Sequence, residues 1–273
     1  DGFRVDVFGD GLGHARMLAT HETHVYLTRP MTGDVLLLAD DDEDGVMDSS
    51  TPVATDLPMV HGIAFRGNMV YLANVKSVYR TTVNPTTGAF GALEELISDL
   101  PDGGQHPLRT LGVGPLDDQL YISVGSSCDA CPETNPEHAT ILRTTPAGTN
   151  RAVFASGLRN TIGFGWHPHT NELWGMDHGS DFPGNNTPPE ELNRLENGKD
   201  YGWPYCFAKQ ELDPIIDDPP GTTKAEYCAM TEPSVLENQA HQAPIGLTFY
   251  TGTSFPEEYQ DDAADNPTTT EYS

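Results

Sequence analysis

Short apolar strands separated by polar turns recur along the chain at a nearly constant period. Four repeats each carry a triplet with an aromatic residue at its centre: Val25-Tyr26-Leu27, Val70-Tyr71-Leu72, Leu120-Tyr121-Ile122 and Leu173-Trp174-Gly175. The central aromatics follow one another at intervals of 45, 50 and 53 residues. Such a period, with several short strands per repeat, is typical of the blades of a β-propeller. We therefore predict an all-β fold of the six-bladed propeller type.

The repeats do not add up to six blades. A fifth repeat begins at Pro244–Phe249, and the residues after Tyr259 carry no strand pattern. An open ring exposes strand edges and an unburied blade face. We expect residues 1–273 to form a single β-propeller domain of four blades and part of a fifth, incomplete at its C-terminal end. Phe3–Phe8 alternates as a strand does, and no segment predicts an amphipathic helix.

Polar and glycine positions are densest in the fourth repeat, between Gly157 and Cys206. Two predicted strands, 162–166 and 172–176, enclose a turn, and a polar loop at 178–189 leads to a third strand at 191–195. Polar loops at the ends of short strands are where binding and catalytic residues concentrate. We expect functional groups at this end of the sheet.

This segment resembles the glucose/sorbosone dehydrogenase family, the soluble six-bladed β-propellers that use pyrroloquinoline quinone (PQQ) and calcium. The resemblance extends from about Gly2 to Tyr259. It implies PQQ- and Ca²⁺-dependent oxidation of a sugar or a related aldose or aldehyde, with an external electron acceptor. It rests on four motifs: Gly157-Leu158-Arg159-Asn160, Asp177-His178-Gly179, Glu191-Leu192-Asn193 and Tyr201-Gly202-Trp203-Pro204.

The resemblance also implies roles for single residues. His106, in a glycine-rich loop, stands where the family has its catalytic base and would take the substrate hydroxyl proton. Arg159 would stabilise the charge that develops on a quinone oxygen, and Asn160 would contact the quinone. Gln105 stands where the glucose branch has Asp, and Arg109 is a second candidate in the same loop. An ordinary structural role is the alternative for each of these side chains.

Two metal sites follow from the same resemblance. Gly179 and Ser180 would offer backbone carbonyls to a Ca²⁺ that polarises the quinone, although the glucose branch has Pro where Ser180 stands. Glu191 and the Tyr201 carbonyl would hold a second, structural Ca²⁺.

A separate acidic run has the spacing of a calcium-binding loop. Its carboxylates stand at positions 1, 3, 5 and 9, with glycine at position 6. Thr51 replaces the glutamate expected at position 12, no helix is predicted on either side, and a solvated acidic turn is the alternative. We predict that this loop binds Ca²⁺ through Asp40, Asp42, Asp44, the Val46 carbonyl and Asp48.

The chain is strongly acidic, with 41 Asp and Glu against 14 Lys and Arg and a formal net charge of −27. This balance excludes the basic surface that nucleic-acid binding requires. Acidic residues are spread along the whole chain, which favours a halophilic protein whose self-repulsion is screened by salt. A secreted protein with several calcium-binding carboxylate clusters is the alternative. No run of 18 apolar residues predicts a membrane span.

Four cysteines are present: Cys128, Cys131, Cys206 and Cys228. A zinc site is less favoured because the second pair is 22 residues apart and lacks histidine support. A redox-active CxxC motif needs a βαβ context that the sequence does not predict. We therefore predict two structural disulfides, Cys128–Cys131 and Cys206–Cys228, and with them an extracytoplasmic location, periplasmic or secreted.

Two other functions stay open at the level of sequence. A nicotinamide fingerprint, GxGxxG between a strand and a helix, is absent, which favours a quinone as hydride acceptor. A calcium-dependent propeller hydrolase of the lactonase type would instead use carboxylates and histidine around a central metal. A binding propeller would keep the scaffold without the chemistry, and Gln105 is compatible with such a loss.

Overall fold

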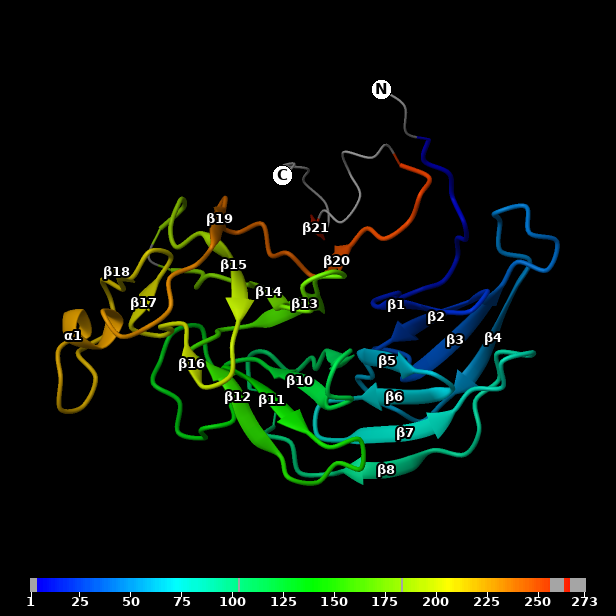
Figure 1. Ribbon diagram of the computed structural model, residues 1–273, viewed down its shortest axis with the longest axis horizontal. Helices are drawn as coiled ribbons and strands as arrows, with labels where there is room; N and C mark the ends of the chain where they lie inside the picture. The colour runs from blue at the N-terminus through cyan, green and yellow to red at the C-terminus, as the bar shows by residue number, and fades with distance from the viewer. Residues whose placement is uncertain (1–3, 103, 183, 256–262, 266–273) are drawn as a thin grey trace. The chain divides into compact units, whose positions relative to one another are not determined.

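The computed structural model describes residues 4–102, 104–182, 184–255 and 263–265. They group into two compact units, one made of Asp1–Leu100 with Leu111–Val113 and the other of Pro101–Thr110 with Gly114–Ser273 (Figure 1). Nearly all regular structure is β-strand, which confirms the predicted all-β class. The single-domain boundary stays a prediction.

The first unit contains two four-stranded antiparallel sheets with strands in sequence order. Each sheet is a meander, the form of a propeller blade. The first blade comprises β1 (Leu18–His21), β2 (His24–Arg29), β3 (Asp34–Ala39) and β4 (Ser49–Ala54). The second comprises β5 (Gly62–Arg66), β6 (Met69–Ala73), β7 (Val78–Thr82) and β8 (Glu94–Ile97), and β9 (Leu111–Val113) belongs to the same unit.

Alternating apolar positions of these strands form the core of the first unit. Tyr26 is fully buried and lies 5.0 Å from Phe65 and 5.1 Å from Phe90 between ring centroids. Its hydroxyl donates to the Gly88 carbonyl at 2.8 Å. A buried phenol needs such an acceptor because an unsatisfied hydroxyl is expensive to bury.

The second unit contains two further blades and several short elements. In the third blade β12 pairs with β11 and β11 with β10, all antiparallel, while β16 adds in parallel to β12. The bounds are β10 (Leu120–Val124), β11 (Thr140–Thr144), β12 (Ala152–Ser156) and β16 (Lys199–Asp200). The fourth blade runs in the order β13 (Thr161–Trp166), β14 (Leu173–Asp177), β15 (Glu190–Leu195) and β19 (Leu236–Asn238).

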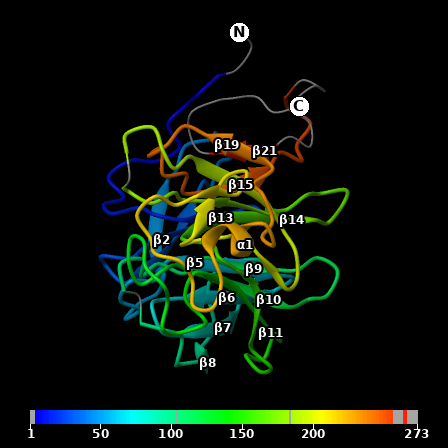
Figure 2. The same ribbon diagram turned by 90° about the vertical axis from the view of Figure 1, so that its left-hand side faces the viewer.

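Two hairpins and one short helix complete the second unit. They are β17 (Cys206–Phe207) with β18 (Glu211–Leu212), β20 (Leu247–Phe249) with β21 (Ala263–Asp265), and α1 (Lys224–Cys228). Figure 1 places α1 beside β17 and β18, and in Figure 2 it faces the viewer. No helix among the described residues is long and apolar enough to cross a membrane.

The predicted aromatic triplets lie in β2, β6, β10 and β14, one in each blade, as a blade repeat requires. Tyr26, Tyr71 and Tyr121 are buried, and Trp174 is half-buried. The three strands predicted around the polar loop agree with β13, β14 and β15 to within one residue at each end. The repeat and the strand pattern are thus confirmed.

Two local predictions are wrong. No strand forms over the described residues 4–8 of the Phe3–Phe8 segment, whose first residue lies outside the described part. Val5 and Val7 are 93% and 71% exposed, so their alternation has no apolar face to pack against. The missed helix α1 carries a capping box, in which the Thr223 side chain accepts from the Glu226 amide and the Glu226 side chain accepts from the Thr223 amide. That signature was readable in the sequence.

Both predicted disulfides are present, and they close loops of very different length. Cys128–Cys131 has a sequence separation of 3 and Cys206–Cys228 a separation of 22. Chain-entropy stabilisation grows with loop length.

Removing Cys206–Cys228 with paired serines should lower the free energy of unfolding by roughly 3 kcal/mol, and removing Cys128–Cys131 by about 2 kcal/mol or less. Urea unfolding of the second unit measures both losses; a larger loss for the short loop would contradict the ranking.

Candidate functional site

The loop that carries His106 is fixed through its backbone by a buried arginine. Arg109 donates from Nη1 to the His106 carbonyl at 2.8 Å and from Nη2 to the Pro101 carbonyl at 2.9 Å. The Gln105 amide donates to the Ser127 carbonyl at 3.0 Å. Burial lowers the pKa of Arg109 to about 10, which leaves it charged at neutral pH. Arg109 therefore shapes the loop through its hydrogen bonds to these carbonyls.

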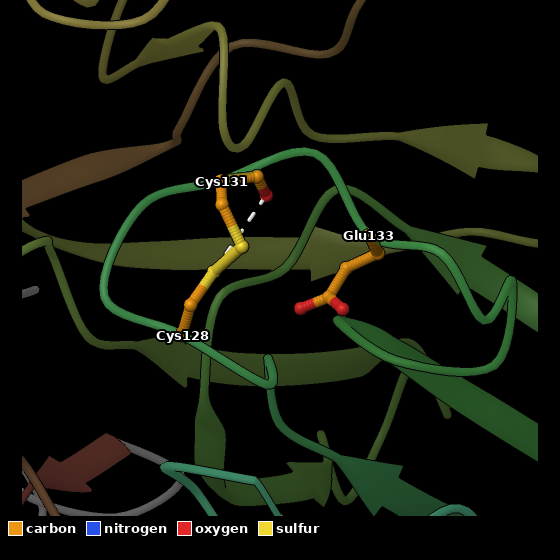
Figure 3. A group of neighbouring side chains, drawn as sticks. All are labelled: Cys128, Cys131 and Glu133. Carbon is orange, nitrogen blue, oxygen red and sulfur yellow. Dashed lines mark hydrogen bonds between the residues drawn. A yellow bond between two sulfur atoms is a disulfide. The ribbon is translucent and has the colours of Figure 1, made fainter.

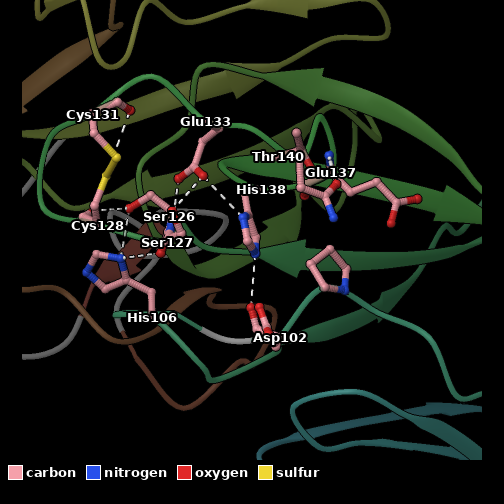
Figure 4. A network of polar contacts seen from close by, with 12 residues as sticks. Asp102, His106, Ser126, Ser127, Cys128, Cys131, Glu133, Glu137, His138 and Thr140 are labelled. Atoms are coloured by element: carbon pink, nitrogen blue, oxygen red, sulfur yellow. Dashed lines mark hydrogen bonds and ion pairs between the residues drawn. A yellow bond between two sulfur atoms is a disulfide. The ribbon is translucent and has the colours of Figure 1, made fainter.

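The imidazole of His106 is oriented by Ser126 (Figure 4). His106 Nδ1 lies 3.0 Å from the Ser126 carbonyl and 2.9 Å from Ser126 Oγ. The Ser126 hydroxyl donates its own proton to the Cys128 carbonyl at 2.6 Å, so both Ser126 atoms accept at Nδ1. Nδ1 therefore carries the hydrogen, and Nε2 keeps its lone pair.

The surroundings of His106 favour the neutral ring. Burial is the largest cause, and it lowers the pKa of His106 to about 4, with the positive charge of Arg159 acting in the same direction. Ser126 and Asp181 oppose this shift without cancelling it. At neutral pH the ring is an unprotonated base with Nε2 as its acceptor.

A glycine lets the two predicted cofactor-site segments meet. Gly125 follows β10, and a Cβ there would lie 2.5 Å from His106 Cβ and 2.6 Å from Asn160 Oδ1. Any larger residue would therefore push His106 and Asn160 apart. The Ser126 amide donates to the Arg159 carbonyl at 2.7 Å, which joins the same two segments. The structure thus brings together His106, Arg159 and Asn160.

A buried carboxylate at the end of β14 holds the turn that carries Arg159 and Asn160. Asp177 accepts from the Arg159 amide, the Asn160 amide and Thr161 Oγ1, each at 2.8 Å. Burial raises the pKa of Asp177, and these hydrogen bonds oppose the shift. The sequence motif contained Asp177 but gave no reason for it; its function is to fix this turn.

The side chains of Arg159 and Asn160 then take different partners. Arg159 donates from Nε to the Asp129 carbonyl at 2.8 Å and from Nη2 to Asp129 Oδ1 at 2.6 Å. Asn160 Nδ2 lies 3.3 Å from His178 Nδ1, and His178 Nε2 lies 2.6 Å from the Pro244 carbonyl. Since Nε2 must donate to that carbonyl, Nδ1 accepts from the Asn160 amide.

The metal ligands predicted from the family resemblance line one cavity of the second unit. Its walls include Asp177, Gly179, Ser180, Glu191 and Tyr201. The two predicted calcium sites are therefore neighbours. The Gly179 amide is engaged by a Glu190 carboxylate oxygen at 2.9 Å, which fixes the backbone at this point.

Two buried carboxylates, those of Asp177 and Glu191, lie together in this cavity. Asp177 and Glu191 face each other in the β14–β15 register, and burial with the nearby Asp177 charge raises the pKa of Glu191 to about 8. Asn193 does not line the cavity, but it donates from Nδ2 to Glu191 Oε2 at 3.0 Å, and its buried Oδ1 has no hydrogen-bond partner among the described residues. Carboxylate and amide oxygens of this kind, with the Tyr201 carbonyl, are the donors that Ca²⁺ prefers. The residues present thus fit a hard cation.

The acidic loop of the first unit gathers only part of its predicted ligand set. Carboxylate oxygens of Asp40, Asp42 and Asp48 come within 4.8 Å of one another. Asp44 lies outside this group, and its carboxylate accepts from the Val46 amide at 2.8 Å. The loop is exposed and its calcium binding stays a prediction.

Comparisons with known proteins agree with this description of the fold. A family model described as TrAA12-like matches residues 1–259. The calcium structure of Trichoderma reesei Carbohydrate-Active Enzymes Family AA12 superposes with a TM-score of 0.81 at 21% identity, over 92% of this chain and 74% of that one. The holo form of the pyranose dehydrogenase PQQ domain from Coprinopsis cinerea gives 0.76 at 18% identity, over 90% and 70%. These likenesses confirm the predicted propeller fold.

Sequence relatives point the same way over shorter lengths. An uncharacterized protein of Borreliella burgdorferi is 29% identical over 219 residues, 76% of this chain and 56% of that protein. The aldose sugar dehydrogenase YliI of Escherichia coli (strain K12) is 31% identical over 115 residues, 42% of this chain and 28% of the enzyme. The chain thus spans about half or less of the length of these two relatives.

The first prediction from the site concerns His106. Its folded pKa lies below the ordinary 6.5, so stability falls as the pH drops from 6.5 toward 4, where only the unfolded chain takes up the proton. Histidine NMR titration should find this pKa near 4. Arg159→Met should raise it because a nearby positive charge is removed, while Arg151→Met should not. A pKa near 6.5 in the parent protein would contradict the burial argument.

The second concerns calcium. Ca²⁺ should raise the melting temperature above its value in chelator, by the equivalent of about 2.7 kcal/mol at a hundredfold excess over Kd. Glu191→Gln should remove the part of this rise that comes from Ca²⁺ in the buried cavity. Asp42→Asn should remove the part that comes from Ca²⁺ in the acidic loop. Calorimetry at fixed ionic strength separates the two. An undiminished calcium shift in either variant would remove that residue from its ligand set.

Proposed function

Since this chain belongs to the TrAA12-like family, we propose that it is a PQQ- and Ca²⁺-dependent oxidoreductase that oxidises a sugar or a related aldose or aldehyde. The observation that carries the proposal is the meeting of a neutral His106 with Asn160 and Arg159 around Gly125, beside a cavity lined by carboxylate and carbonyl oxygens. The named relatives that bind PQQ or oxidise sugars support the same class.

The residues present fit the cofactors that this function needs. Arg159 and Asn160 would hold the quinone, and the carbonyls of Gly179 and Ser180 would hold a Ca²⁺ beside it. Glu191 and the Tyr201 carbonyl would hold the structural Ca²⁺, since both residues line the same cavity. When bound, PQQ supplies a hydride acceptor and Ca²⁺ supplies Lewis acidity.

The chain's own contribution to the reaction is proton transfer and charge stabilisation. His106 Nε2 takes the proton of the substrate hydroxyl, and the ring then becomes an imidazolium. The Ser126 carbonyl and hydroxyl keep Nδ1–H in place throughout. Ser126 thus orients the His106 ring. In the glucose branch this orientation comes from the Asp that stands in place of Gln105. Arg159 stabilises negative charge that develops beside it.

The proposal includes a compartment and partners. Two disulfides support an extracytoplasmic protein, periplasmic or secreted. There, electrons from the sugar pass to an external acceptor. The charge of −27 is compatible with a saline environment, so assays should cover a range of salt concentrations.

The test combines cofactor binding with a histidine variant. Addition of PQQ and Ca²⁺ should change the absorption spectrum of the cofactor, and a dye-linked assay should then detect oxidation of one or more aldoses. His106→Ala should lower kcat by on the order of 10²–10⁴, because the base is lost, with PQQ affinity largely kept. His169→Ala, at an exposed position, is the matched control.

Two outcomes would overturn the proposal or its assignment of the base. Equal turnover by His106→Ala and the parent protein would remove His106 from the mechanism. Absence of a spectral change with PQQ, together with calcium-dependent hydrolysis of a lactone, would favour the hydrolase alternative.

A further inference from the structure

The loop Cys128-Asp-Ala-Cys131 contacts Arg159 directly and His106 through Ser126. The Cys128 carbonyl accepts from Ser126 Oγ at 2.6 Å, and Ser126 holds His106 Nδ1. The next residue, Asp129, holds Arg159 through its carbonyl and its carboxylate. One short loop thus reaches the proposed base and the proposed cofactor arginine.

This loop is fixed at its base by a second set of contacts. Figure 3 shows Glu133 beside the Cys128–Cys131 disulfide. Glu133 accepts from the Ser127 amide at 2.6 Å and from Ser127 Oγ at 2.7 Å (Figure 4). Its Oε2 also lies 3.1 Å from His138 Nδ1. The disulfide and this carboxylate therefore tie the loop on both sides.

Asp129 accepts two of the five N–H donors of the Arg159 guanidinium. The Asp129 carbonyl accepts from Arg159 Nε. Asp129 Oδ1 accepts from Arg159 Nη2 and also from the Asp181 amide at 2.8 Å. The Arg159 side chain is only 4% exposed. Nη1 makes a long contact of 3.5 Å to the His178 carbonyl. The orientation imposed by Asp129 thus leaves Nη1 as the least engaged donor for an anionic or carbonyl ligand.

The short disulfide suits positioning better than global stability. A cross-link with a sequence separation of 3 removes little entropy from the unfolded chain, whereas it limits the loop to few native conformations. A guanidinium is useful for catalysis only when its planar donors are held in the productive geometry. The position of Asp129 between the two cysteines meets that requirement.

We propose that Asp129, held by the Cys128–Cys131 ring, is the positioning residue for Arg159, so that an intact disulfide is needed for a well-ordered quinone-binding arginine. The role at the quinone rests on the proposed function. The ordering of Arg159 itself does not, and it can be measured without any cofactor.

The first experiment follows the arginine alone. In full-length chain labelled with ¹⁵N-arginine, Arg159 should give a protected Nε–H signal and separate Nη signals, assigned with Arg159→Lys. Asp129→Ala should merge the Nη signals through free rotation of the guanidinium. Cys128→Ser/Cys131→Ser should also lose the Nε–H protection. Asp129→Asn keeps an Oδ1 acceptor and should retain the separate signals.

A matched control distinguishes positioning from general loss of an ion pair. Glu137 pairs with Arg151 at 2.8 Å in the same unit with similar carboxylate exposure, 23% against 22% for Asp129. Glu137→Ala should leave the Arg159 signals unchanged. Unaltered Arg159 signals in Asp129→Ala, or in the double serine variant, would overturn the proposal. If Asp129→Ala does not fold, the Asn and double serine variants decide in the same assay.

The second experiment measures PQQ affinity at saturating Ca²⁺ by quenching of protein fluorescence. Asp129→Ala should weaken binding on the order of 10–100-fold, the usual effect of losing a group that orients a ligand-binding residue. In an Arg159→Met background the same change should have little further effect, because Asp129 acts through Arg159. Equal losses in both backgrounds would contradict this. Absence of PQQ binding by the parent protein would instead refute the proposed function and leave the arginine test intact.

Discussion

Asp177 ends strand β14 with its carboxylate buried, and that carboxylate accepts hydrogen bonds from Arg159, Asn160 and Thr161. A buried carboxylate without partners would be protonated or would destabilise the fold. Three donors from one turn make this burial tolerable and at the same time fix the turn. The direction of the Arg159 and Asn160 side chains depends on this contact, because the backbone amides of both residues are hydrogen-bonded to Asp177.

The charge pattern of the site follows from a scarcity of cations. The chain has 14 basic against 41 acidic residues, so carboxylates outnumber cations. The buried Arg159 forms an ion pair with Asp129. Arg159 still acts on His106, where its charge and the burial of the ring both lower the pKa. Arg109 donates to carbonyls of the loop that carries His106, so it stiffens the backbone around His106.

Much of the fold could be predicted from the sequence because each blade repeats the same local pattern. The aromatic triplets mark one strand of each blade, and the Arg159-Asn160 and Asp177 motifs mark the ends of neighbouring strands. Contacts between distant loops could not be predicted in this way. Asp129 lies inside the CxxC motif, which predicts a disulfide but no contact with Arg159, and Ser126 belongs to no motif. The contacts of both residues depend on which backbone atoms the folded loops bring near them. The Phe3–Phe8 strand was wrong for a related reason, since alternation alone does not provide a partner surface.

Asp177 also connects the arginine turn with the cavity proposed to bind Ca²⁺. Both oxygens of its carboxylate accept from the turn. Its cross-strand neighbour is Glu191, whose pKa is raised by burial and by Asp177 itself. A cation among these oxygens would relieve the repulsion between the two carboxylates and favour their ionised forms. The ionised Asp177 is in turn the better acceptor for the Arg159 and Asn160 amides. Cation binding in the cavity and ordering of the proposed quinone-binding turn would therefore stabilise each other through the Asp177 side chain.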